Sequence, residues 1–193
     1  MTLEYAILGF LEREPMTGYD LKTRCFDDAA GHVWTADQSQ VYRTLERLSD
    51  RGLVRSKVVP QRGKPDRRIH RITDKGRRAL LDWLRQPQPA VSVRDPFLMR
   101  VFLSADLSDG EIAGLLTRAR DDYQARLEAL RLDAAAPVPS CAATDARGAE
   151  LYRMTLGAAM SATRGVIDWI DDCVDRVSRG LPPAAPQATG EGV

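Results

Sequence analysis

One amphipathic helix, expected within residues 35–53 (TADQSQVYRTLERLSDRGL), constrains the fold of this chain more than any other segment. Thr35 and Gln38, three residues apart, predict a capping box at its start, in which each side chain satisfies an unpaired backbone N–H. Gly52 follows the last turn and can take the left-handed conformation that ends many helices. The apolar residues that recur at helical spacing and share one face are Val41, Leu45 and Leu48.

The N-terminal half of the opposite face of this helix carries hydrogen-bonding groups rather than the Glu and Lys pairs of an ordinary solvated helix. Glutamine and arginine are the side chains that pair bidentately with base edges in a major groove, so the pattern favours a DNA-recognition helix. The alternative is an ordinary polar surface. The candidate DNA-contacting residues of this helix are Gln38, Ser39, Gln40, Tyr42, Arg43 and Arg47.

The distribution of charge supports the first interpretation. The whole chain has a net charge of only +1, but residues 36–78 contain 13 basic and five acidic residues. Residues 88–193 contain 11 basic and 15 acidic residues. A basic patch focused on one region is typical of proteins that bind a polyanion, and a merely solvated basic surface is less consistent with acids placed elsewhere.

The segments before this helix predict two more helices. Apolar residues recur at helical spacing over 3–11, and Pro15 ends that first helix because the residue before a proline avoids the helical region. Thr17 and Asp20 form a capping pair that opens a second helix, from residue 18 to about residue 26. Trp34, directly before the expected Thr35 cap, is expected to act as a hydrophobic staple.

After Gly52 the hydrophobic period changes from helical to alternating. Residues 53–59 and 69–72 are rich in β-branched side chains and predict two strands, and Thr73 opens a further helix. The connection over 60–68 contains glycine and proline, which predict a turn. The basic residues of this hairpin that join the candidate DNA contacts are Arg62, Lys64, Arg67 and Arg68.

The second half of the chain predicts a helical domain. A proline-containing linker (86–94) precedes a short, strongly apolar helix (95–103) that we expect to be buried. Ser108 and Glu111 predict a capping box for a long helix, and a second long helix is expected over about 146–179, after a loop at 133–144. Two long amphipathic helices call for partner helices. The candidate dimerisation residues are Ile112, Leu116, Tyr123, Leu127, Val166, Trp169, Ile170, Cys173 and Val177.

The predicted fold class is therefore mostly α with a small β-hairpin. Residues 1–86 are expected to form a winged helix-turn-helix domain, residues 95–180 a helical, coiled-coil-like dimerisation domain, and residues 181–193 a disordered tail. No apolar run approaches the roughly 20 residues that span a bilayer, and the first residues lack the basic region of a signal peptide.

Composition and motifs argue against an enzyme. The two histidines, His32 and His70, are isolated from any nucleophile or ligand cluster, and no phosphate-binding glycine loop is present. We therefore expect no catalytic residue, no metal and no cofactor. The three cysteines are far apart and lack a CxxC pair, which favours a reducing cytoplasm over a disulfide scaffold.

Three segments carry a resemblance to a known family: LEYAILGFLEREPMTGYDL, QSQVYRTLERLSDRGLV and RRIHRITDKGRRALLDWL. Together they resemble the DNA-binding domain of the PadR family of bacterial transcriptional regulators, with characteristic spacing at Tyr42, Leu45, Leu48 and Gly52 and again at 73–76. His70 departs from the pattern, in which an aromatic residue, often Tyr, is commoner. The second half resembles, in architecture, the longer PadR proteins, whose C-terminal helical domain dimerises.

This resemblance implies a homodimer that binds a pseudo-palindromic operator in double-stranded DNA. The helix beginning near Thr35 would enter the major groove, with Arg47 nearer to phosphate, and the wing would reach phosphates or a narrow minor groove. Repression is the commoner mode of the family. The alternatives are a transcriptional activator of the same fold and a winged-helix module that contacts only proteins.

The resemblance also implies a response to a small-molecule effector, often a phenolic or other aromatic compound. The aromatic residues that are candidates for lining its pocket, expected at the dimer junction, are Trp34, Trp83, Tyr152 and Trp169, together with Tyr123. The alternative is that each of these side chains is only core or interface packing.

Overall fold

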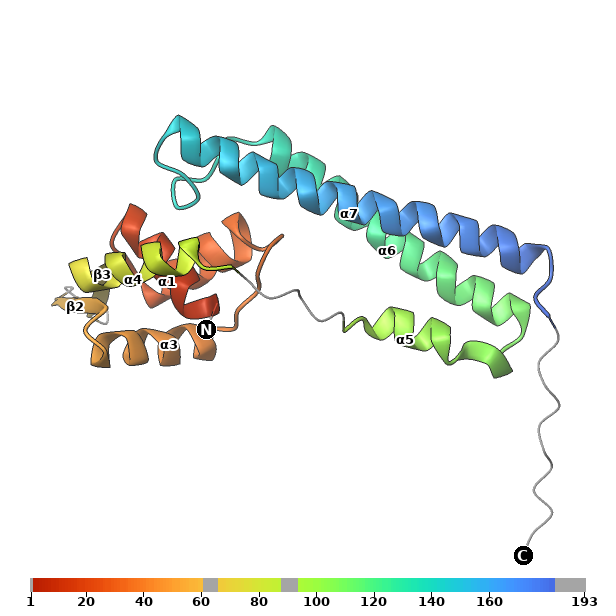
Figure 1. Cartoon of the computed structure of the whole chain (residues 1–193), viewed down its shortest axis with the longest axis horizontal. Helices are drawn as coiled ribbons and strands as arrows, with labels where there is room; N and C mark the ends of the chain where they lie inside the picture. Colours follow the sequence, from red (N-terminus) through yellow and green to blue (C-terminus); the bar gives the residue numbers. More distant parts are fainter. Residues whose placement is uncertain (1, 61–65, 88–93, 183–193) are drawn as a thin grey trace, which may run out of the picture. The chain divides into compact units, whose positions relative to one another are not determined.

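The computed structural model describes residues 2–60, 66–87 and 94–182, and its contacts divide the chain into two compact units (Figure 1). The first unit comprises residues 1–89 together with 133–159, and the second comprises 90–132 together with 160–193. The sequence predicted one helical domain over 95–180, whereas residues 133–159 pack with the first unit. Cys141 and Ala142 cause this difference, because both are buried in the core of the winged helix.

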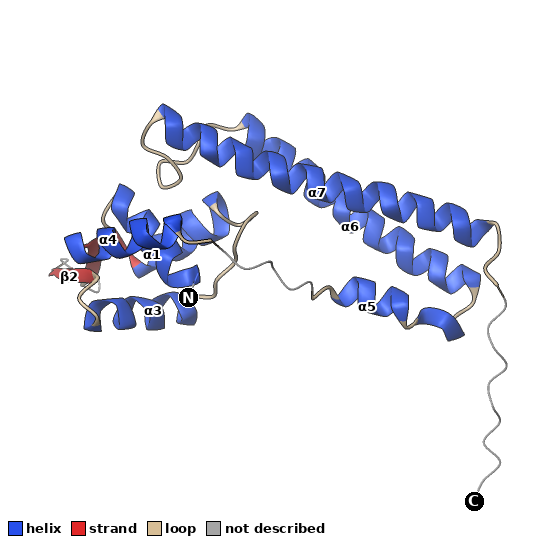
Figure 2. Ribbon diagram, in the orientation of Figure 1, coloured by secondary structure: helices blue, strands red, loops and turns tan. Residues whose placement is uncertain are grey.

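The first unit has the predicted winged helix-turn-helix order, with strands between α3 and α4 (Figure 2). α1 packs against α3, α4 and β3, so that one core serves all the helices. The elements are α1 (Thr2–Arg13), β1 (Met16–Thr17), α2 (Gly18–Asp20), η1 (Leu21–Ala29), α3 (Gln38–Asp50), β2 (Val54–Val59), β3 (Arg67–Ile72) and α4 (Asp74–Arg85).

The core of this unit is formed by the predicted inner face of α3 together with α1 and η1. Phe10 and Phe26 meet edge to face, with ring centroids 5.3 Å apart. The largest fully buried apolar side chains that these three helices contribute are Ile7, Leu8, Leu11, Leu21, Phe26, Val41, Leu45 and Leu48.

The second helix begins with the predicted capping box. Asp20 N donates to Thr17 Oγ1, and Thr17 N donates to Asp20 Oδ2, both at 3.1 Å. After one turn the helix continues as a π-helix, η1, in which each N–H bonds five residues back. Ala30 N, for example, donates to Cys25 O at 2.7 Å. This wide spacing was not predicted from the sequence.

The start of α3 differs from the prediction. Asp37, not Thr35, is the N-cap, and its carboxylate accepts from Gln40 N at 2.7 Å while Asp37 N donates to Gln40 Oε1 at 3.2 Å. An Asp three residues before a Gln makes the same capping box, and its charge also favours a helix N-terminus. The residue before the cap is therefore buried Ala36, so the staple prediction for Trp34 is wrong.

The end of α3 is as predicted. Gly52 has a φ of 68°, in the left-handed region. Leu53 N donates to Leu48 O and Gly52 N donates to Ser49 O, each at 2.9 Å, which completes a Schellman motif. The backbone can therefore turn directly from the recognition helix into the wing.

The sheet is antiparallel, in the order β1-β3-β2. The predicted pair β2–β3 is aligned so that Val54 faces Ile72 and Ser56 faces His70. The short strand β1 was not predicted, because two residues carry no periodicity. It pairs Met16 with His70 and so joins the wing to the turn between α1 and α2.

The second unit contains α5 (Pro96–Phe102), η2 (Ser104–Asp106) and parts of the long helices α6 (Asp109–Ala135) and α7 (Ala146–Ser178). The predicted capping box of α6 is confirmed, since Ser108 N donates to Glu111 Oε2 at 2.9 Å and Glu111 N donates back to Ser108 Oγ at 3.4 Å. α6 and α7 run antiparallel and pack against each other. The buried residues at the centre of their contact are Ile112, Leu116, Ile170 and Val177.

The helix over 95–103 was predicted to be buried against something, and within this one chain it is covered only in part. Phe97 and Val101 pack against the α6–α7 core, but no residue of α5 is buried. The side chains on its other face are exposed to different degrees, namely Leu98 (41%), Met99 (56%), Phe102 (80%) and Leu103 (67%). Intrachain contacts therefore leave much of the apolar surface of α5 exposed.

Several predictions fall outside the described residues, namely Arg62, Lys64, most of the linker and nearly all of the 181–193 tail. A search of the described helices finds none with the length and apolar character that crossing a membrane requires.

Candidate nucleic-acid interface

The exposed face of α3 is ordered by a chain of side-chain hydrogen bonds along its first turns. Ser39 Oγ donates to Asp37 Oδ1 at 2.7 Å. Arg43 Nη2 donates to Ser39 Oγ at 3.1 Å, and Arg43 Nε donates to Ser39 O at 3.3 Å. The bonds from Ser39 and from Gln40 N lower the pKa of Asp37. The Arg43 guanidinium is thus folded toward the N-terminal end of α3, where a recognition helix meets bases.

Two other predicted DNA contacts, Gln40 and Arg47, also form hydrogen bonds within the protein. The Gln40 oxygen is used by the capping box, which leaves its amide NH₂ to donate. Arg47 Nη2 donates to Thr44 Oγ1 at 3.0 Å, and the neighbouring Arg51 pairs with Glu4 at 3.0 Å. Arg47 remains 63% exposed along its side chain. The Gln40 NH₂ group can therefore donate to a base edge while the capping box is kept, and Arg47 stands farther along the helix, as expected for a phosphate contact.

A hollow of about 560 Å³ lies between α2, α3 and β3. Tyr42 lines it from α3 and lies against Gly18, while Arg67 and Arg68 line it from the wing. Tyr42 is 41% exposed. The structure thus brings these three predicted DNA contacts to one depression, beside Gln38, Ser39 and Arg43 on the exposed face of α3.

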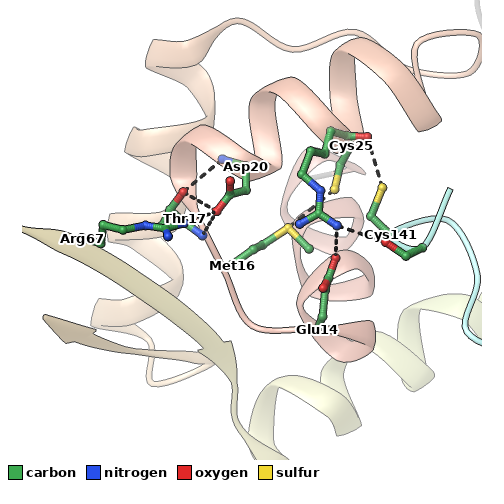
Figure 3. A network of polar contacts seen from close by, with 9 residues as sticks. Glu14, Met16, Thr17, Asp20, Cys25, Arg67 and Cys141 are labelled. Atoms are coloured by element: carbon green, nitrogen blue, oxygen red, sulfur yellow. Dashed lines mark hydrogen bonds and ion pairs between the residues drawn. The ribbon is translucent and has the colours of Figure 1, made fainter. Parts of the chain in front are cut away.

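The base of the wing is tied to the second helix through Arg67. Its Nη2 donates to Asp20 Oδ2 at 3.3 Å, the same oxygen that accepts from the Thr17 hydroxyl at 2.7 Å (Figure 3). Burial alone raises the pKa of Asp20, but the Thr17 hydrogen bonds and the Arg67 and Arg24 charges outweigh burial and lower it. Arg67 therefore orients the wing, and Arg68 is exposed beside it.

Three further cations lie on the sheet and were missed by the sequence analysis. Arg55 stands directly opposite Arg71 across the β2–β3 pair, and Lys57 follows on the same face. All three are exposed. Like charges directly opposite each other destabilise a sheet unless an anion lies between them, which makes this face a candidate phosphate contact. Because side chains alternate between the two faces of a strand, the sequence could have placed Arg55 and Lys57 on one face of the sheet.

His70, the departure from the family pattern, is a packing residue. It is 4% exposed, and its Nδ1 shares a hydrogen bond of 2.9 Å with Ser56 Oγ. Burial and the nearby Arg68 charge lower the pKa of His70. The imidazole is therefore neutral near pH 7, and His70 is paired with Met16 of β1 on one side and with Ser56 of β2 on the other.

Three of the four predicted effector residues line one cavity of about 340 Å³ within the first unit. Trp34, Trp83 and Tyr152 contribute aromatic walls, and Arg13 and His32 contribute polar groups. His32 Nε2 lies 2.9 Å from Thr155 Oγ1, and its ring meets Tyr152 edge to face at 5.6 Å. Trp83 also stacks on Tyr5 at 4.8 Å.

The fourth predicted effector residue lies elsewhere. Trp169 belongs to the second unit and packs edge to face against Phe97, with centroids 6.1 Å apart. Tyr123 is partly buried in the same core. For these two residues the structure favours the packing alternative.

The predicted dimerisation residues divide into two groups. Ile112, Leu116, Ile170 and Val177 are buried between α6 and α7 of the same chain, so their first role is intrachain packing. Leu127 is also buried. The predicted residues that pack beside this α6–α7 contact and stay partly exposed are Tyr123, Val166, Trp169 and Cys173. The apolar stripes of α6 and α7 were expected to need partner helices. They are mostly buried against each other within the same chain.

Comparison with known proteins agrees with the fold. Residues 7–82 match the model of the transcriptional regulator PadR-like family, and residues 93–178 match the model described as virulence activator alpha C-term. The chain is 28% identical over 183 residues to the negative transcriptional regulator PadR of Bacillus subtilis, covering 92% of this chain and 98% of that protein.

Solved structures extend the likeness. B. subtilis PadR in complex with operator DNA aligns with a TM-score of 0.80 at 26% identity, and the same protein with p-coumaric acid gives 0.75 at 27%, each covering 92% of this chain and 99% of that one. The Vibrio cholerae virulence activator AphA gives 0.70 at 26%, covering 93% and 99%. This DNA-binding chain therefore belongs to the PadR family of transcriptional regulators, in the longer form with a C-terminal helical domain.

Proposed function

We propose that this protein is a repressor that binds a pseudo-palindromic operator as a homodimer and is released by a small aromatic acid. The observation that carries the DNA-binding half of this proposal is the ordered face of α3, where Asp37 and Ser39 hold Arg43 toward the N-terminal end of the helix. Guanidinium groups held in this way lose little entropy on pairing with a guanine edge.

Base contacts are assigned to the first turns of α3 and backbone contacts to the rest. Gln38, Ser39, Gln40, Tyr42 and Arg43 face the major groove. Arg47 and the wing arginines, with the exposed cations of β2 and β3, meet phosphates. The relative whose structure contains operator DNA supports this arrangement by its likeness in fold. Such a regulator acts where the genome is, in the bacterial cytoplasm, and needs no membrane partner, cofactor or metal.

The dimer is proposed from the exposed face of α5. Phe102 and Leu103 are 80% and 67% exposed, and Leu98 and Met99 lie beside them, which is an apolar patch that a monomer rarely leaves in water. A second copy would cover it and add the partly exposed seam at Tyr123, Val166, Trp169 and Cys173. Two-fold symmetry would then present two α3 helices to successive major grooves.

The effector is proposed to occupy the aromatic cavity of the first unit. Trp34, Trp83 and Tyr152 can stack on a phenyl ring, and Arg13 can pair with a carboxylate. The cavity wall includes the connector residues Val33 and Trp34, which come just before the Asp37 cap of α3. A ligand that binds the DNA-competent and incompetent forms unequally can therefore shift their populations. B. subtilis PadR, solved with p-coumaric acid, supports an aromatic acid as ligand class.

Activation of transcription is the second candidate. The likeness to the V. cholerae virulence activator AphA favours it. Repression is preferred because one relative aligned by sequence, B. subtilis PadR, is a negative regulator. A reporter gene under the promoter of the protein's own gene separates the two, since deletion of the regulator raises expression under repression and lowers it under activation.

The test of DNA recognition is a salt titration of binding to two duplexes of equal length. One is the DNA just upstream of the protein's own gene, and the other is its scrambled sequence. We expect tighter binding to the upstream duplex that persists at about 200 mM salt, because base contacts do not release counterions. Equal and steep salt dependence on both would indicate electrostatic attachment alone. No binding to either would favour a module that contacts only proteins.

A further inference from the structure

Two of the three cysteines lie in the same buried core of the first unit although they are far apart in the sequence. Cys25 lies in η1, and Cys141 lies in the segment between α6 and α7 that packs with the winged helix. They are 0% and 1% exposed. Figure 3 shows the Cys25 thiol between Met16 and Cys141 in this view, and Cys25 Sγ lies 3.6 Å from Met16 Sδ.

The segment that carries Cys141 is anchored by polar contacts around the thiols. Cys141 Sγ donates to Arg24 O at 3.1 Å. The Arg24 guanidinium donates to Ser140 Oγ at 3.1 Å and to Glu14 Oε1 at 2.5 Å. Because the Arg24 side chain is 43% exposed, solvent reaches the edge of this cluster.

The two thiols differ in their readiness to ionise. Interaction with Cys141, together with burial, raises the pKa of Cys25. Interaction with Cys25 lowers the pKa of Cys141, and the Arg24 charge acts in the same direction. The thiolate is the reactive form of cysteine, and Cys141 lies beside the partly exposed Arg24, at the edge that solvent reaches, so we take Cys141 as the thiol that reacts first and Cys25 as the thiol that resolves it.

We propose that Cys25 and Cys141 are a peroxide-responsive thiol pair that closes to an intramolecular disulfide within the first unit. Cys141 sulfur attacks one peroxide oxygen, the O–O bond breaks, and the leaving hydroxide takes a proton to form water. Cys25 sulfur then attacks the resulting sulfenic acid, the S–O bond breaks, and the Cys25 proton leaves with the hydroxide as a second water. Two thiols lose two electrons, which reduce one peroxide to two waters.

Access of the oxidant depends on local opening of the covering segment. Residues 136–145 form no helix or strand, and the backbone hydrogen bonds at their centre are Ala142 N to Pro139 O and Ala143 N to Pro139 O. Such segments open more readily than helices do. Closure would fasten this segment to the helix-turn-helix covalently, beside the aromatic cavity that Ala142 also lines.

Peptide mapping of the full-length wild-type protein tests the proposal without any variant. Trypsin places the three cysteines on separate peptides, spanning 25–43, 132–147 and 165–176. After treatment with hydrogen peroxide, denaturation and alkylation, we expect the first two to be joined at two mass units less than their sum. We also expect the oxidised protein to melt several degrees above the reduced one, because the bond closes a long loop. Both changes should reverse with a reducing agent.

Matched variants assign the reaction. Cys141→Ser and Cys25→Ser should each abolish the linked peptide, and Cys141→Ser should also abolish trapping of sulfenic acid by dimedone. Cys173→Ser, in the other unit, should change neither result. The proposal is overturned if Cys25 and Cys141 remain fully alkylated after peroxide treatment. It is equally overturned if the only disulfide joins Cys173 between two chains, or if the linked protein melts below the reduced one. None of these results depends on DNA binding.

Discussion

The winged-helix unit and the helical unit manage their apolar surface in opposite ways. In the first unit the large apolar side chains of α1, η1 and α3 are turned inward, and the face that α3 leaves to solvent is polar and cationic. In the second unit α6 and α7 bury a narrow seam, while α5 exposes Phe102 at 80% and Leu103 at 67%.

This difference indicates that the first unit buries its core within one chain, whereas the second unit needs a further chain to cover its exposed apolar helix. The winged helix needs no other chain to close its core, so its stability is set by its own packing. The helical unit buries its apolar surface to the same degree only when α5 is covered, and we propose that a second copy of the chain covers it. Variants in each unit should therefore affect different quantities, folding in one and association in the other.

The largest effect is expected in the core of the first unit. Leu48 is fully buried, and Leu48→Ala should lower the free energy of unfolding by about 2–5 kcal/mol, because transfer and cavity terms add. Urea denaturation followed by circular dichroism measures this. Leu84→Ala on α4, where the side chain is 62% exposed, is the control and should change stability by less than about 0.5 kcal/mol. Similar losses for both would remove the contrast between a closed core and an open surface.

The next effect separates folding from association. Phe102→Asp combined with Leu103→Asp should leave the far-ultraviolet circular dichroism spectrum unchanged and raise the dimer dissociation constant at least a hundredfold, since each buried apolar side chain contributes about 1.5–3 kcal/mol. Sedimentation equilibrium reports the mass, against 21.4 kDa for one chain. Leu84→Asp, another exposed leucine, should leave the dimer intact. A dimer that survives the α5 changes would assign the interface to another surface.

A smaller effect tests how the reading face is ordered. Asp37→Ala should lower Tm by a few degrees and weaken specific DNA binding, because it removes the helix cap and the acceptor that holds Ser39. Thr35→Ala is the matched control and should change neither quantity, since Thr35 is not the cap. Differential scanning fluorimetry gives the first result and fluorescence anisotropy the second. The reverse outcome would restore the capping box expected at Thr35.

The smallest effect concerns pH. Burial lowers the pKa of His70 below the unfolded value of about 6.5, so the unfolded chain binds more protons in the window below that value. Stability should therefore be full above pH 6.5 and fall as the pH drops toward 5.5. His70→Phe should reduce this slope, which melting curves at pH 7.5 and 5.5 reveal. An unchanged slope would mean that other groups cause the acid sensitivity.

The sequence predicted those features of the fold that depend on local patterns. The inner face of α3, the cap at Thr17, the Gly52 turn, the β2–β3 hairpin and the Ser108 cap all follow from spacing within a few residues. The N-cap of α3 was mispredicted at Thr35, because Asp37, two residues later, forms the same capping box and its negative charge also favours a helix N-terminus. The π-helical hydrogen bonds of η1 leave no distinct pattern.

The features that were missed depend on contacts between distant residues. Nothing near Cys141 in the sequence indicates that it lies in the same core as Cys25, and the stripes of α6 and α7 do not reveal whether their partner is in the same chain. For the same reason Trp169 was grouped with Trp34, Trp83 and Tyr152, whereas only those three line one cavity. The sequence shows which aromatic residues are present, but it does not show which of them line the same cavity.

The central claim is that the first turns of α3 read base sequence while the wing binds backbone. The most direct test measures the affinities of Arg43→Ala and Arg68→Ala for a duplex selected from random sequences and for its scrambled form, over a range of salt concentrations. We predict that Arg43→Ala loses about 1–3 kcal/mol on the selected duplex alone. Arg68→Ala should weaken both duplexes alike and reduce the salt slope by about one. If Arg43→Ala weakened both duplexes equally, base reading by α3 would be contradicted.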